Sequence, residues 1–138
     1  MEKSVHIAIK SGLSVIEKCL RDILQATKAR SESKNWLFKR RHYDLSEDIA
    51  RELTVKAEEM LKEIQELQRT FEIGRDDESA RWHIIGNLAE IWTMLSDLSP
   101  DKLRGYGQMR PEDGKLLTMH VDRVNEIRED MERLLSAQ

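Results

Sequence analysis

The sequence has few of the residues that interrupt or cross-link a chain. Its 138 residues include one cysteine, two prolines and six glycines, and aromatic residues make up only 5%. The single Cys19 has no partner for an intramolecular disulfide, which favours a reducing compartment, and we expect it within an apolar helical stripe. Scarce proline and glycine, with 36% charged and 39% hydrophobic residues, are typical of amphipathic helices. We therefore predict an all-α protein.

The sequence also lacks long hydrophobic runs. No stretch approaches about 18 consecutive apolar residues, and the first ten residues show no basic region followed by an apolar one. We expect a cytoplasmic protein with no membrane partner. The formal net charge of -3 gives no global attraction to nucleic acid, so we do not favour that partner. A chain of this length can bury its own core, so residues 1–138 are predicted to be a single helical-bundle domain.

Apolar residues recur at spacings of three and four in four segments, which predicts four helices. The first is expected over residues 5–27, the third over about 79–98, and the fourth begins at Pro111. The second starts with a capping box formed by Asp44 and Glu47 and stops near Gly74. The short connection at Gly74 makes helices 2 and 3 antiparallel neighbours. We predict an antiparallel up-down-up-down four-helix bundle with long loops between helices 1 and 2 and between helices 3 and 4.

The third helix is apolar on more than one face. One face toward the bundle accounts for Ile85, Leu88, Trp92 and Leu95. A second set, Ile84, Ile91 and Met94, is left to look elsewhere. We predict a homodimer interface on this second face. The alternative is that helix 3 is simply the most buried of the four.

Cationic and aromatic residues gather in two of the predicted loops. Residues 28–43 carry six cationic residues against one acidic residue, a local charge of +5, with aromatic residues interleaved. Residues 102–110 form the second stretch, entered through a short helical turn that Ser99 caps and Pro100 begins. In the predicted topology both stretches lie at the same end of the bundle. They would form one basic and aromatic pole.

This pole is the predicted working surface. We expect Arg40, Arg41, Arg104 and Arg110 to supply charge, and Trp36 and Tyr106 to stack on a ligand. The predicted function is a non-catalytic interaction or regulatory module that binds an anionic ligand or an acidic protein partner. A structural alternative has Trp36 and Phe38 plugging the end of the bundle while the arginines pair with acidic helix ends.

A second functional class is suggested by the carboxylates of helix 2. The residues Glu58, Glu59, Glu63 and Glu66 resemble the magnesium-binding helices of all-α nucleotide pyrophosphohydrolases. That resemblance implies a second acidic helix, for which only Glu90 and Asp97 are candidates. We favour a solvated face with a Glu58–Lys62 ion pair, and keep a small magnesium-dependent nucleotide hydrolase as the alternative function. The four histidines lack ligand spacing, so no metal site, cofactor or catalytic residue is predicted.

Overall fold

The computed structural model describes residues 1–28 and 36–137, and within these residues the chain is all-α. Five α-helices and one short 3-10 helix are present there, and no strand, which confirms the predicted class. The chain divides into two compact units, Met1–Arg75 and Asp76–Gln138. Each unit contains one pair of long helices. The four-helix topology and the single domain remain predictions.

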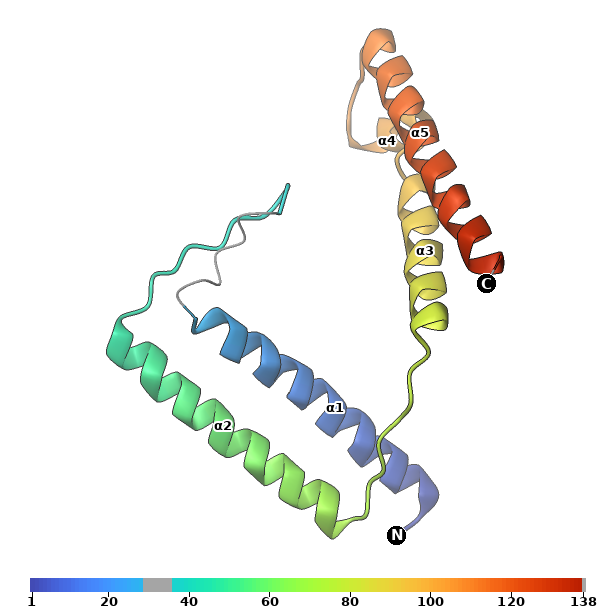
Figure 1. Ribbon diagram of the computed structural model, residues 1–138. Helices are drawn as coiled ribbons and strands as arrows, with labels where there is room; N and C mark the ends of the chain where they lie inside the picture. The colour runs from blue at the N-terminus through green and yellow to red at the C-terminus, as the bar shows by residue number, and fades with distance from the viewer. Residues whose placement is uncertain (29–35, 138) are drawn as a thin grey trace. The chain divides into compact units, whose positions relative to one another are not determined.

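The first unit pairs α1 (Lys3–Ala26) with α2 (Glu47–Thr70), which lie side by side in Figure 1. The pair is antiparallel, because the imidazole Nε2 of His6 donates to the carbonyl oxygen of Phe71 at 3.2 Å and joins the start of α1 to the end of α2. Both helices lie where the spacing of apolar residues predicted a helix. The buried core of the pair is small and is made by Leu20, Ala50, Ala57 and Ile73.

The side chain of Cys19 is exposed, so its placement in the apolar stripe was wrong. The reason is helical geometry: the stripe passes through Leu20, which is only 3% exposed, and successive residues of a helix point in different directions.

The two ends of α2 differ from the predicted ones. The capping box of Asp44 and Glu47 is wrong, because Ser46 is the N-cap and its hydroxyl oxygen accepts from the backbone N–H of Ile49 at 3.2 Å. At the other end the helix stops at Thr70 rather than near Gly74.

A non-glycine residue makes the turn that ends α2. Glu72 adopts a left-handed conformation with φ of 51°. Its N–H donates to the carbonyl of Arg69 at 3.2 Å, and the N–H of Ile73 donates to that of Gln68 at 2.9 Å. These two bonds make a Schellman motif, in which glycine is usual at the position that Glu72 occupies.

The second unit contains α3 (Ala80–Ser96), α4 (Pro100–Leu103), the 3-10 helix η1 (Arg104–Tyr106) and α5 (Pro111–Ser136). The helices α3 and α5 pack side by side (Figure 1). They are antiparallel, because the guanidinium Nε of Arg81 donates to the carbonyl of Leu135 at 3.3 Å. Ser99 caps α4 and Pro111 starts α5, as predicted. Leu88 of α3, at 2% exposed, is the most buried large apolar residue described in this unit.

A charged residue occupies the apolar stripe of α5. The stripe runs through Val121, Val124, Met131 and Leu135, and its spacing of three and four places Arg128 in the same row. Arg128 is 9% exposed. Its Nε donates to the side-chain oxygen of Asn125 at 2.8 Å, and its Nη1 forms an ion pair with Glu132.

Both units leave much apolar surface uncovered. In the first unit Val5, Ile16 and Ile23 of α1 are 41–46% exposed. On α3 the second apolar set is partly exposed, with Ile84 at 39%, Ile91 at 41% and Met94 at 54%. Trp92, expected to face the bundle, is 53% exposed. Among the helices that the structure describes, none combines the length and the apolar character needed to cross a membrane.

Candidate functional site

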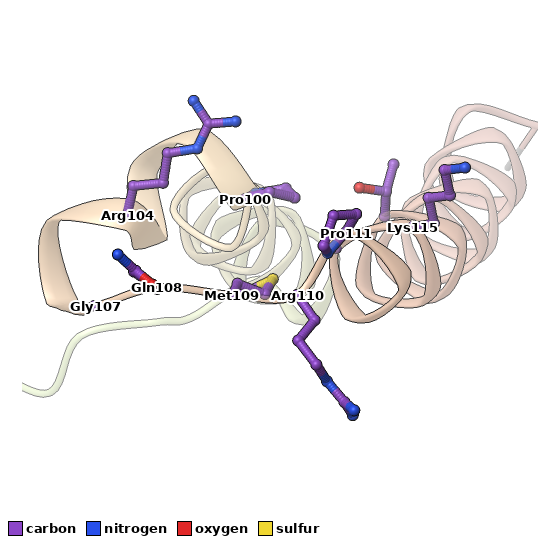
Figure 2. A pocket seen from close by; sticks show the side chains of 10 residues that line it. Pro100, Arg104, Gly107, Gln108, Met109, Arg110, Pro111 and Lys115 are labelled. Atoms are coloured by element: carbon purple, nitrogen blue, oxygen red, sulfur yellow. The ribbon is translucent and has the colours of Figure 1, made fainter.

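An open pocket of roughly 770 Å³ lies in the second unit, between α4, the segment 107–110 and the start of α5 (Figure 2). Its lining combines three cationic side chains with glycines, prolines and uncharged polar groups. The lining residues are Pro100, Arg104, Gly107, Gln108, Met109, Arg110, Pro111, Gly114, Lys115 and Thr118. The pocket therefore contains most of the second basic stretch.

Two glycines and two prolines shape this pocket. Gly107 has φ of 154° and ψ of -176°, a region open essentially only to glycine, and it lets the chain leave η1 toward α5. Pro111 supplies the first residue of α5. Gly114 is buried, and an added Cβ would lie 3.6 Å from both Met109 Sδ and Pro100 Cγ. The start of α5 thus sits close to the start of α4.

Two of the three cations are already paired with neighbouring carboxylates. Arg104 Nη1 lies 3.3 Å from Asp101, and Arg110 Nε lies 3.1 Å from Asp113. All four side chains are exposed, Asp113 least at 48%, so water screens both pairs; the two-point contact of Arg110 with Asp113 is the stronger one. A stronger anion can therefore compete for either arginine at small cost. In Figure 2 the two guanidinium groups point in opposite directions.

Lys115 differs from the two arginines. Within the part of the chain that the structure describes, its ammonium group makes no ion pair or side-chain hydrogen bond. It lies one turn into α5, and its spacing of four from Pro111 and three from Thr118 puts these lining residues on one side of the helix. Sequence reasoning missed Lys115 and Thr118, although this helical spacing after Pro111 could have indicated them.

The structure places the predicted residues of the second stretch in two ways. Arg104 and Arg110 line the same pocket. Tyr106 belongs to the adjacent η1, is 91% exposed and is not among the lining residues. Its predicted stacking role remains a prediction.

The other predicted residues lie in the first unit, on the segment 36–46 that leads into α2. Trp36 is 60% exposed, and the ammonium group of Lys39 lies 5.6 Å from the centre of its ring. Arg40 is exposed and Arg41 is half-buried. Phe38 is 97% exposed, so within this unit it does not plug the helix pair. Arg30 and Lys34, counted in the basic stretch, lie outside the described residues.

Hydrogen bonds attach the end of this segment to the helices. The hydroxyl of Tyr43 donates to the carbonyl of Thr27 at 3.2 Å, just after α1. The hydroxyl of Thr54 on α2 lies 3.1 Å from that of Thr27. Tyr43 therefore has a structural role. The shared pole of the two basic stretches remains a prediction, because they belong to separate units.

The carboxylates of α2 lie along a solvated face. Glu59 pairs with Lys56 at 3.4 Å and Glu66 pairs with Arg69 at 3.2 Å, while the expected Glu58–Lys62 pair is not formed. Among the described residues, no three His, Cys, Asp or Glu side chains are grouped so that they could hold a metal ion. No observation on α2 therefore favours the nucleotide-hydrolase alternative.

Comparisons of the chain with protein-family models, with curated proteins and with solved structures find no match.

Proposed function

We propose that this protein is a non-catalytic interaction or regulatory module that binds an anionic ligand or an acidic segment of a protein partner. The observation that carries the proposal is the pocket beside α5. It is lined by Arg104, Arg110 and Lys115, and the lysine has no anionic partner among the described residues. Three cationic side chains line this open surface, and arginine binds carboxylate or phosphate through two parallel hydrogen bonds, so each arginine offers a separate anion contact.

In this proposal the two helix pairs pack together as the antiparallel up-down-up-down four-helix bundle and form one domain. Support comes from apolar side chains that each pair leaves exposed, since such surface favours burial. Examples on α2 and α5, at 40–51% exposure, are Leu53, Met60, Leu67, Val124, Ile127 and Met131. In that bundle Trp36, Arg40 and Arg41 would share one pole with Arg104, Tyr106 and Arg110.

The proposal also includes a homodimer through α3 and a cytoplasmic location. The partial exposure of Ile84, Ile91 and Met94 supports the dimer. The location is supported by the exposed thiol of Cys19, for which the sequence offers no second cysteine.

Anion binding is tested by isothermal titration calorimetry with inorganic pyrophosphate and with a hexaglutamate peptide. We expect at least one of these probes to bind, and Lys115→Gln and Arg104→Gln each to weaken it by about fivefold or more, because each removes a charge-assisted contact. Asp113→Asn should strengthen binding, because it removes a negative charge and releases Arg110. The matched control is Arg123→Gln, an exposed arginine of α5 paired with Glu126 outside the pocket.

The proposal fails if neither probe produces binding heat at millimolar concentration. It also fails if Lys115→Gln and Arg104→Gln leave the affinity at the level of the Arg123→Gln control.

The dimer is tested separately by sedimentation equilibrium at tens of micromolar protein. We expect a dimer that dissociates when Ile91 and Met94 are both replaced by serine. Leu134→Ser is the control, because Leu134 is 74% exposed and lies on α5 rather than α3. A monomeric wild-type chain would refute the dimer while leaving the pocket intact.

A further inference from the structure

Three consecutive apolar side chains stand exposed in the first unit. Trp36 is 60% exposed, Leu37 is 88% and Phe38 is 97%. Single exposed apolar residues are common, but a run of three with two side chains almost fully in water is a surface feature that calls for a partner. The chain bends at Leu37 and Phe38, so these side chains lie at a turn outside the helices.

This run is held by a defined attachment. Figure 1 shows the segment after residue 36 running outside the α1–α2 pair before it enters α2. Its far end is tied down where the hydroxyl of Tyr43 binds the carbonyl of Thr27 at 3.2 Å. Four residues separate Phe38 from the hydrogen-bonded Tyr43, so the apolar run lies close to an anchored part of the chain.

Cationic residues follow the apolar run directly. Lys39, Arg40 and Arg41 come next in the chain, in a protein whose net charge is -3. The ammonium group of Lys39 lies 5.6 Å from the ring centre of Trp36, within the range of a cation–π contact. The ammonium group of Lys39 thus lies close to the ring of Trp36, and the two residues between them in the chain, Leu37 and Phe38, are more exposed than Trp36.

We propose that residues 36–41 bind peripherally to an anionic lipid bilayer, with Leu37 and Phe38 inserted at the boundary between headgroups and acyl chains. Trp36 would lie at the interfacial level, where indole rings are enriched, and Lys39 and Arg40 would contact the lipid phosphates and carboxylates. This inference goes beyond the proposed function and does not depend on the pocket of the second unit.

A bilayer fits these residues better than a folded acidic partner does. The run lies at a bend, and a fluid bilayer accepts apolar side chains without a complementary shape. Charge complementarity then selects anionic lipid. We expected no membrane partner from the sequence because it has no long apolar run. A long apolar run is needed only by a helix that spans the bilayer, and not by a short segment that binds at its surface.

The test is co-sedimentation of the full chain with vesicles of phosphatidylcholine alone and of phosphatidylcholine with about 30% phosphatidylserine. We expect binding to the anionic vesicles and at least about tenfold weaker binding to the neutral ones. Lys39→Gln with Arg40→Gln should weaken binding by about 25-fold, since each cation near a charged surface contributes about fivefold. Leu37→Ser with Phe38→Ser should weaken it by at least about tenfold.

Matched controls exclude general effects of charge and hydrophobicity. Arg75→Gln removes an exposed cation, and Leu134→Ser removes an exposed apolar side chain, both outside residues 36–41. Neither should change vesicle binding. Circular dichroism of each variant should retain the wild-type helix content, because the substituted side chains at 37 and 38 are almost fully exposed.

Insertion is measured directly with Trp82→Phe and Trp92→Phe combined, which leaves Trp36 as the single tryptophan. Its emission should shift to shorter wavelength on anionic vesicles and be quenched by brominated acyl chains. The inference is overturned if anionic vesicles do not bind the chain at millimolar lipid, or if binding ignores the Leu37 and Phe38 substitutions. Vesicle binding lost only through Arg104→Gln would assign it to the pocket and would also overturn the inference.

Discussion

The two helix pairs of this protein are built alike but handle charge differently. In the first unit Lys39 and Arg40 lie on an exposed segment beside Trp36, and none of the unit's described buried residues is charged. In the second unit Arg128 lies within the apolar stripe of α5 at 9% exposure, and three further cations line a pocket. The same helical period can therefore support a plain apolar contact or one that contains a charge.

The units also differ in how their ends are joined. The first has a side-chain to backbone hydrogen bond at each end of the pair, from His6 to Phe71 and from Tyr43 to Thr27. The second has such a bond from Arg81 to Leu135 at one end. At its other end α4 packs on Gly114 through Pro100. The contact of α4 with Gly114 lies beside the cationic pocket. The hydrogen bond from Tyr43 instead anchors the end of the exposed segment 36–41.

The largest expected effect comes from the most buried leucine of each unit. Leu20→Ala and Leu88→Ala, at 3% and 2% exposure, should each lower the free energy of unfolding by about 2–5 kcal/mol because each leaves a cavity. Hydrogen exchange followed by mass spectrometry reports the two units separately. Under the proposed single bundle, each substitution reduces protection in both units. Reduced protection confined to the substituted unit would show that the units fold independently.

Arg128 tests the buried charge of the second unit. Arg128→Ala should cost about 2 kcal/mol, mainly from lost packing of its long side chain. Arg128→Leu should be neutral or stabilising, because a hydrophobic residue in an apolar stripe avoids the desolvation of a charge. Urea denaturation measures both. If leucine is as damaging as alanine, the guanidinium contacts with Asn125 and Glu132 stabilise the unit more than this comparison assumes.

Glu72 tests the end of α2 in the first unit. Glu72→Gly should raise the free energy of unfolding by about 1 kcal/mol, because a left-handed conformation costs an L-residue about this amount and costs glycine almost nothing. Glu72→Ala is the control that removes the carboxylate but keeps the backbone cost. Thermal denaturation compares the three chains, and equal stability of the alanine and glycine variants would contradict the backbone explanation.

Gly114 should give the smallest effect. Gly114→Ala should stabilise the second unit by up to about 1 kcal/mol, because alanine favours the helix and its Cβ would meet ordinary contacts at 3.6 Å. Gly107→Ala provides the contrast, since φ of 154° is strained for alanine and should reduce stability. Denaturant midpoints rank the two variants. A destabilised Gly114→Ala would contradict this account, because contacts at 3.6 Å leave room for the added methyl group.

Helical periodicity was enough to predict the long helices and the start of α5 at Pro111. It could not predict the end of α2, because a glutamate at Glu72 takes a conformation that sequence rules give to glycine. It also could not predict that Arg128 lies in the apolar stripe of α5. A hydrophobicity pattern counts only apolar residues, and so omits a charged residue that is buried together with its hydrogen-bond partners Asn125 and Glu132.

The candidate site was predictable only in part. Arg104 and Arg110 were chosen from their loop, and both line the pocket, although their ligand role remains a prediction. Lys115 was missed because it lies inside α5, one turn after Pro111, and not in a loop. The four-helix topology that would place the two basic stretches at one pole depends on which apolar faces pack together. Helical periodicity alone does not determine that packing.

The central claim is that the cationic surface beside α5 binds anions. The most direct measurement is a ¹⁵N-resolved NMR titration of the full chain with inorganic pyrophosphate and with hexaglutamate. We predict saturable shifts centred on the amides of residues 104–118, accompanied by shifts at 36–41 if the two basic stretches share one pole. Absence of saturable shifts in residues 104–118 with both probes would contradict the claim.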